Sequence, residues 1–289
     1  MTPLRLFALT AFTMTAFAAN SLLCRQALAH TTIDPASFTS IRLISGALVL
    51  WLLVRLTSKH KVRGGNWGSA AALFVYAAAF SFAFVSLPAA VGALLLFGTV
   101  QTVMIVAGLR AGERLNLRQT GGLVLALAGL IILLRPGLTA PPLVGSLLML
   151  TAGIGWGVYS LRGRGNSDPA AATAGNFLRA APIAILLSLV LLMRLHLDPA
   201  GVMYALLSGG LASGVGYVAW YAALRDMTAT TAAIVQLSVP VIAAIGGILL
   251  LNEQLTTRLI LSSIAILGGI ALVVARKIRN ATPASASAD

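Results

Sequence analysis

Charged side chains are scarce in this sequence. Asp, Glu, Lys and Arg together make up 9% of the 289 residues, whereas about a quarter of the residues in a soluble domain are charged. Hydrophobic residues make up 58%, and the mean hydropathy is +0.94. A soluble globular fold is therefore excluded, because too few polar groups remain to cover its surface.

Acidic side chains are the scarcest of the charged ones, with seven Asp and Glu against twenty Lys and Arg. None of the seven falls in the interior of a long apolar stretch, and His30, His60 and His196 also lie outside these stretches. A proton relay within a membrane usually needs a buried carboxylate or histidine. The sequence therefore argues against a proton-coupled antiporter of organic cations.

Cysteine and clusters of reactive groups are missing as well. Cys24 is the single cysteine, which excludes an internal disulfide. An enzyme acting on lipid needs His, Asp, Glu or Cys clustered near the membrane face, and the chain offers no such cluster. The basic excess is not interleaved with aromatics, as a nucleic-acid-binding surface would be. We expect no metal, no cofactor, no nucleic-acid partner and no enzymatic activity.

Ten long apolar stretches are what the sequence does have. A membrane-spanning helix needs roughly 20 mainly apolar residues, because its backbone polar groups must be satisfied within the segment. The polar breaks predict spans at residues 4–28, 36–56, 67–87, 89–110, 118–135, 142–161, 171–193, 199–224, 229–251 and 257–275. The sequence thus predicts an all-α integral membrane protein with ten transmembrane helices.

The basic residues predict how these spans are oriented. In alternate loops, fourteen Lys and Arg fall on one side of the membrane and four on the other. Cytoplasmic loops carry the excess of Lys and Arg. We therefore expect both termini in the cytoplasm and the protein in the inner (plasma) membrane of a bacterium, with the lipid bilayer around it.

The two halves of the chain resemble each other. Glu113 follows the fourth span and Glu253 the ninth, 140 positions apart, and Gly129 meets Gly269 at the same shift. Five spans per half is an odd number, so the second copy must cross the membrane in the opposite sense. Inverted repeats of this kind are typical of alternating-access transporters. We expect five-helix units at residues 1–137 and 138–279, and a disordered cytoplasmic tail at 280–289.

Short motifs carry a family resemblance over nearly the whole chain. The second half reads Gln-Leu-Ser-Val-Pro (236–240), Gly-Gly (246–247), Asn-Glu-Gln-Leu (252–255) and Gly-Gly (268–269), and the first half reads Gly-Glu-Arg-Leu (112–115) and Gly-Gly (121–122). The chain resembles the drug/metabolite transporter superfamily in its EamA branch, and within it the YddG-type exporters of aromatic and other neutral amino acids. The position of the first half that corresponds to Pro240 is occupied by Val100. This departure from the family pattern bears on the identity of the substrate more than on the fold.

The resemblance implies two inverted repeats around a central cavity. The cavity would be lined by the first, third, fourth, sixth, eighth and ninth spans, and the protein is expected to act as a monomer. The scarcity of acidic residues favours a neutral or zwitterionic small-molecule substrate and uncoupled movement. Efflux of drugs or nucleosides by the same fold remains the alternative.

The candidate substrate-binding residues are aromatic and amide side chains within the spans. An apolar wall with a few hydrogen-bonding groups is typical of a small-molecule pocket. These candidates are Asn20, Tyr76, Phe80, Gln101, Trp156, Tyr159, Trp220 and Gln236. Ordinary packing or the interfacial belt is the competing interpretation for each aromatic, most of all for Trp220.

Five further residues are predicted to serve structure or gating. Arg42 and Arg179 lie inside spans at matching repeat positions, which favours bonds to backbone carbonyls over contact with a substrate carboxylate. Pro240 should kink the ninth span. Glu113 and Glu253 are expected to form ion pairs or to accept from a helix N-terminus.

Overall fold

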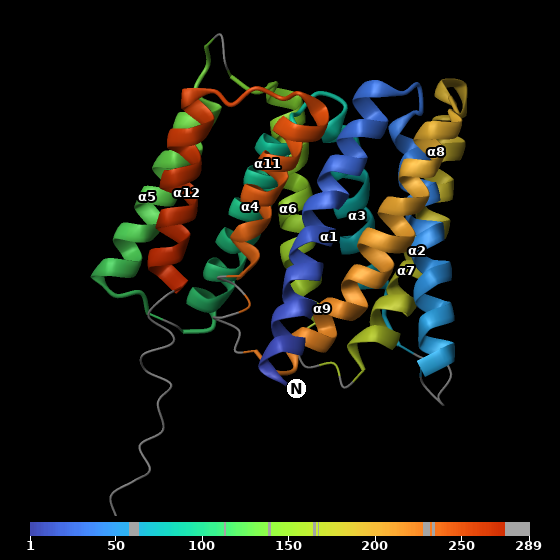
Figure 1. The fold of residues 1–289 in the computed structure, drawn as a ribbon, viewed down its shortest axis with the longest axis horizontal. Helices are drawn as coiled ribbons and strands as arrows, with labels where there is room; N and C mark the ends of the chain where they lie inside the picture. The colour runs from blue at the N-terminus through green and yellow to red at the C-terminus, as the bar shows by residue number, and fades with distance from the viewer. Residues whose placement is uncertain are drawn as a thin grey trace, which may run out of the picture.

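The computed structural model describes residues 1–57, 64–112, 114–137, 140–163, 166, 168–227, 232 and 235–274, and within them the regular structure is helical throughout (Figure 1). The elements are α1 (Pro3–His30), α2 (Pro35–Thr57), α3 (Trp67–Phe84), α4 (Ala89–Arg110), α5 (Leu117–Leu134), α6 (Leu143–Gly163), α7 (Pro169–Val190), η1 (Leu192–Arg194), α8 (Pro199–Leu206), η2 (Leu207–Val215), α9 (Gly216–Leu224), α11 (Ser238–Leu251) and α12 (Thr257–Val274).

Eight helical segments of the described chain are long and apolar enough to cross a membrane. Seven are α1 to α7, and the eighth is the continuous helix Pro199–Leu224, made of α8, η2 and α9. The helices α11 and α12 are apolar but shorter. The prediction of an all-helical membrane protein is therefore confirmed.

Helix starts follow from local sequence signals. Pro opens α1, α7 and α8, where its missing N–H costs no hydrogen bond. The side chains of Asp168 and Asp198 cap the last two of these helices by accepting from backbone N–H groups three residues on. At α5 the cap is reciprocal, because Asn116 and Gln119 each accept from the other's backbone.

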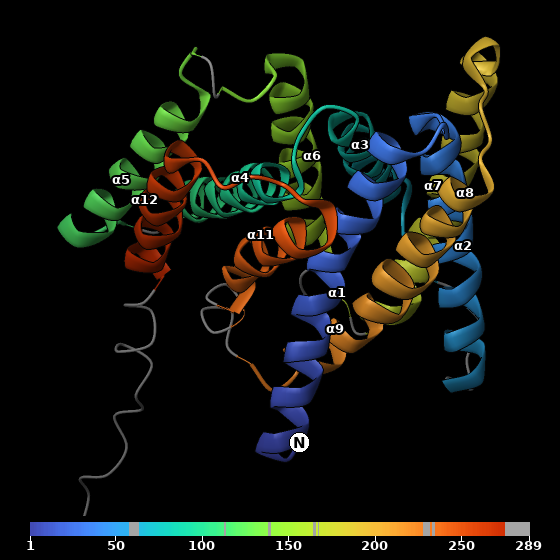
Figure 2. The ribbon, with the colours of Figure 1, turned by 45° about the horizontal axis from the view of Figure 1, so that its top comes forward.

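The helices contact one another in corresponding pairs. One side of the bundle is the pair α5 and α12, and the other contains α2 and α7 (Figures 1 and 2). Between these two sides, α3 and α4 of the first half each pack on α6, the first helix of the second half. Correspondingly, the segment α8 to α9 and the helix α11 of the second half each pack on α1, the first helix of the first half. The helices α4 and α11 also contact each other. Each of the contacts named here has a counterpart when the two halves of the chain are exchanged.

The connections gather at two ends of the bundle. In Figure 1 the N-terminus lies at the lower end, and the connections after α1, α3, α5, α7 and α11 lie at the upper end. Two hydrogen bonds between Asp34 and His196 join upper connections from different halves: Asp34 donates its N–H to the carbonyl of His196 at 3.0 Å and accepts the N–H of His196 at 3.1 Å.

Two local features add detail to the sequence prediction. Pro240 was expected to kink the middle of the ninth span. Val235 and Gln236 are helical, the helix is interrupted at Leu237, and α11 begins at Ser238, so Pro240 lies in the first turn after the interruption. A proline is tolerated there because the N–H of that turn has no partner within the helix. The eighth span was predicted as one regular helix, yet η2 is a nine-residue π-helix, which frequently occurs at functional sites.

Candidate functional site

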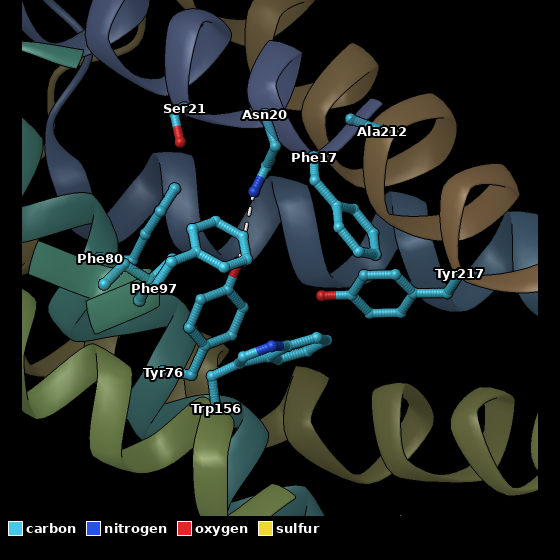
Figure 3. A pocket seen from close by; sticks show the side chains of 10 residues that line it. Phe17, Asn20, Ser21, Tyr76, Phe80, Phe97, Trp156, Ala212 and Tyr217 are labelled. Carbon is cyan, nitrogen blue, oxygen red and sulfur yellow. Dashed lines mark hydrogen bonds between the residues drawn. The ribbon is translucent and has the colours of Figure 1, made fainter. Parts of the chain in front are cut away.

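A small cavity lies at the centre of the bundle, where helices of both halves meet (Figure 3). Its volume is about 20 Å³, which is room for about one water molecule. The lining residues are Phe17, Asn20, Ser21, Tyr76, Phe80, Leu96, Phe97, Trp156, Ala212 and Tyr217. They come from α1, α3, α4, α6, η2 and α9, so every described neighbour of the cavity is a helix.

Aromatic rings form most of the wall. The ring of Trp156 lies at the centre of this group, 5.0 Å from the ring of Tyr76, 5.1 Å from Tyr217 and 5.5 Å from Tyr159, on which it stacks at 28°. Phe17 meets Tyr217 edge-on at 5.8 Å. Such pairs contribute about 0.5–1.5 kcal/mol each beyond their buried area, and their faces offer a platform for a planar or apolar ligand.

A chain of hydrogen bonds crosses this wall. Ser208 of η2 donates to Oδ1 of Asn20 at 2.6 Å, and Nδ2 of Asn20 donates to the hydroxyl of Tyr76 at 3.3 Å. Nη2 of Arg42 donates to the same hydroxyl at 2.9 Å. All four side chains are buried. The network joins α1, α2, α3 and η2. Its members Asn20 and Tyr76, together with Ser21 and Tyr217, supply the polar groups of the cavity lining.

The close approach of η2 to α2 depends on glycine. A Cβ atom on Gly209 would overlap the carbonyl oxygen of Arg42 and the hydroxyl of Ser45. The π-helix thus brings its backbone against α2 beside Arg42 and turns Ser208 toward Asn20. The π-helix is therefore part of the site, because it supplies the hydroxyl of Ser208 that donates to Asn20.

The two arginines inside spans have different surroundings. Arg179 donates from Nη1 to the carbonyls of Gly64 at 3.0 Å and Gly175 at 2.8 Å, so it supports the backbone before α3. The guanidinium carbon of Arg42 instead lies 4.9 Å from the ring centre of Phe80 and 5.2 Å from that of Tyr76. Arg42 is 1% exposed and does not reach the surface.

The predicted substrate-binding residues divide into three sets. Asn20, Tyr76, Phe80 and Trp156 line the cavity. Tyr159 and Trp220 lie behind the lining, in ring contact with Trp156 and Phe17 respectively. Gln101 is buried on α4, and Gln236 is half-buried before α11, but neither is among the lining residues.

Sequence reasoning did not select Phe17 and Phe97, which the structure places in the wall. Phe17 precedes Asn20 by three positions and Phe97 precedes Gln101 by four. Residues at these spacings share a helix face. The signal was present, but an apolar residue in an apolar helix carries no mark that separates a cavity wall from ordinary packing.

Glu253 joins the halves at the upper end of the bundle. Its two carboxylate oxygens accept the backbone N–H of Ala89 at 2.8 and 2.9 Å, and Oε1 lies 3.4 Å from Nε of Arg25. Asn252 holds the left-handed conformation that ends α11, with φ at 52°, and the N–H of Glu253 closes this turn on the carbonyl of Gly247. The matching Glu113 lies outside the described residues.

A second hollow, of about 200 Å³, lies beside Glu253 between the upper parts of α4 and α11. Most of its wall is apolar, with Val91 and Ile248 on the two helices. It is separate from the aromatic cavity, with which it shares no lining residue. Among the described residues, no group of three or more His, Cys, Asp or Glu could hold a metal ion.

Comparisons with known proteins agree with this architecture. Residues 5–135 and 143–275 each match the EamA-like transporter family. The chain is 56% identical to an uncharacterized protein of Pseudomonas aeruginosa over 96% of this chain and 97% of that protein. It is 26% identical to the uncharacterized transporter YoaV of Bacillus subtilis over 58% of this chain and 60% of that one, and 26% identical to an uncharacterized transporter of Archaeoglobus fulgidus over 93% and 97%. A solved crystal structure shares the fold, with a TM-score of 0.67 at 18% identity over 95% of this chain and 98% of its own.

Proposed function

Because this chain belongs to the EamA-like transporter family, we propose that it exports small neutral metabolites, chiefly aromatic and other neutral amino acids, across the bacterial inner membrane. The observation that carries the proposal is the aromatic cavity between the halves, with its polar chain through Asn20 and Tyr76. A pocket of apolar walls and a few hydrogen-bonding groups is the usual form of a small-molecule site.

The transporter works as two inverted five-helix units, residues 1–137 and 138–279, with ten transmembrane helices and both termini in the cytoplasm. Two observations support this arrangement. The family match occurs once in each half, and larger helix contacts such as α3 with α6 have a counterpart in the exchanged halves, here α8 to α9 with α1. The short α11 and α12 then complete the second unit, and a single chain forms the whole pathway.

Transport proceeds by alternating access. A cavity of about 20 Å³ is too small for an amino acid, so the aromatic wall must move apart when substrate enters from either side. The contacts of Glu253 with Arg25 and Ala89 close the upper, outward end. Breaking them while the lower end closes exposes the cavity to the outside.

The cavity suggests how an aromatic amino acid is held. Its side chain packs on the rings of Tyr76, Phe80 and Trp156, and its polar end replaces part of the network at Asn20. Movement is driven by the substrate's own gradient, because no Asp or Glu lies in a described helix to carry a proton.

Counterflow of labelled tryptophan in proteoliposomes tests the proposal. The wild-type protein should exchange tryptophan, and Trp156→Ala and Asn20→Ala should each lower the rate about tenfold or more while the protein stays folded. Trp67→Ala is the matched control, because Trp67 is 62% exposed and is not among the residues that line the cavity. Counterflow of a labelled nucleoside or organic dication that unlabelled tryptophan and threonine do not inhibit, together with no counterflow of tryptophan, would instead support the alternative of nucleoside or drug efflux.

A further inference from the structure

A buried positive charge beside the cavity has no carboxylate to neutralise it among the described residues. Arg42 is 1% exposed. The described acidic side chains are all engaged elsewhere: Asp34, Asp168 and Asp198 accept from backbone N–H groups, Asp226 pairs with the N-terminal amine, and Glu253 pairs with Arg25 and Ala89. An unpaired charge in an apolar interior is costly.

The guanidinium of Arg42 also keeps unused donors. Its Nη2 donates to Tyr76, but Nε and Nη1 are buried without a hydrogen-bond acceptor in the described part of the chain. Arg179, at the matching position of the second half, is bound to two backbone carbonyls. A structural role explains Arg179, but it leaves the charge and the free donors of Arg42 unexplained.

Only two rings separate this guanidinium from the cavity. Arg42 lies against Tyr76 and Phe80, and both of these side chains line the cavity wall. The cavity must widen to admit a ligand, and a rotation of either ring joins the guanidinium to the widened space. Nη2 has a second N–H besides the one that it donates to Tyr76. That N–H and the free donor beside it, on Nε or on Nη1, form a planar fork, the geometry that suits a carboxylate.

We propose that Arg42 binds the carboxylate of the substrate, and that the transporter selects small aromatic monocarboxylates, with or without an amino group. The inference rests on the proposed function and names its substrate class. The site offers one cation and, in the described residues, no anion. A substrate ammonium therefore meets ring faces and the neutral oxygens of Asn20, Ser21 and the tyrosines, whereas a substrate carboxylate neutralises a buried charge.

Four probes of similar shape test this selectivity. Indole-3-acetate, tryptophan, indole-3-acetamide and tryptamine all carry the indole ring but differ in charge. Their equilibrium binding is measured at pH 7 with the purified full-length protein in nanodiscs. The acetate should bind about tenfold or more tightly than the amide, as a charge-assisted hydrogen bond allows, and tryptamine should bind most weakly. Amide binding as tight as the acetate, tryptamine binding as tight as the acetate, or no binding of the acetate would each overturn the proposal.

Substitutions of the two arginines test whether Arg42 is the source of the preference for the acetate. Arg42→Gln should bring the acetate-to-amide ratio to within about threefold of one, while Arg179→Gln should leave it unchanged. Arg42→Lys keeps the charge but loses the fork, so an intermediate ratio is expected, and this variant serves if the glutamine variant does not fold. A ratio unchanged in a folded Arg42 variant would contradict the assignment.

Measuring both binding and counterflow distinguishes a failure of this inference from a failure of the proposed function. Selective binding of the acetate without counterflow of any probe would refute transport and leave the carboxylate site standing. Counterflow of tryptophan without preference for the acid over the amide would refute the carboxylate site alone.

Discussion

Glu253 accepts the backbone N–H of Ala89 through both carboxylate oxygens, although the two residues lie 164 positions apart. Ala89 is the first residue of α4, where unsatisfied N–H groups give the helix end a partial positive charge. Arg25 adds a full positive charge 3.4 Å from the same carboxylate. One acidic side chain thus ties the connection after α11 to helices of the first half.

Removing this carboxylate should open the upper end more often. Glu253→Ala leaves the N–H of Ala89 and the guanidinium of Arg25 without their acceptor, at a cost of about 1–3 kcal/mol. Cys24 is the only cysteine of the chain, is 0% exposed, and lies next to Arg25. Its labelling by a membrane-impermeant maleimide added outside the cell should rise about tenfold.

Asp198→Ala provides the control for this experiment. Asp198 also accepts a helix N–H at the upper end, but from Gly201 within its own helix. Its removal should leave Cys24 labelling as in the wild type. Equal labelling in all three proteins would show that Glu253 does not hold this end closed.

Gly209→Ala should destabilise the protein. Alanine normally favours a helix by about 1 kcal/mol over glycine, but a Cβ here overlaps the backbone of Arg42. The melting temperature in detergent should fall by several degrees. Gly210→Ala is the matched neighbour, since its nearest contact is a side-chain carbon of Val49 at 3.2 Å, and it should melt within about two degrees of the wild type. A reversed order would contradict the close contact of η2 with α2.

Tyr76→Phe should lower stability with little change in packing volume. The hydroxyl of Tyr76 accepts from Arg42 and Asn20, and its loss leaves two buried donors unpaired, which costs about 1–3 kcal/mol. Tyr204→Phe on α8 removes a hydroxyl from a half-buried position and is the control. Thermal unfolding of both variants measures the difference. Equal melting temperatures would mean that the polar network contributes nothing to folding.

An imposed pH gradient should change the rate of tryptophan counterflow by less than about twofold. Proton coupling needs a group that titrates within the pathway, and the described helices contain no Asp or Glu, while His30 is exposed at the end of α1. Proteoliposomes with equal and unequal pH across the membrane provide the comparison. A rate that follows the size of the gradient would require a coupled mechanism.

Much of the helical architecture could be predicted from sequence. The first eight predicted spans agree with the structure within three residues at each end, because polar breaks and prolines mark where an apolar helix must stop. The start of α11 at Ser238 could not be predicted in this way. The residues before it are as apolar as a helix, and Pro240 suits either a kink or a first turn.

The candidate site was predictable in part. Asn20 and Tyr76 were conspicuous because a polar group in an apolar helix needs a partner. Ser208 was not, since its role depends on the π-helix that turns it toward Asn20. The difference between Arg42 and Arg179 was also hidden, because the repeat makes their positions equivalent and only their neighbours in space differ.

The central claim is that the two halves cross the membrane in opposite senses around one cavity. Arg114 and Gln254 are exposed and occupy the same place in the two halves, 140 positions apart. In a Cys24→Ser background, Arg114→Cys and Gln254→Cys are labelled one at a time with an impermeant maleimide on intact cells. The account predicts labelling at position 254 from outside, and at position 114 only after permeabilisation. Labelling of both positions from the same side would contradict it.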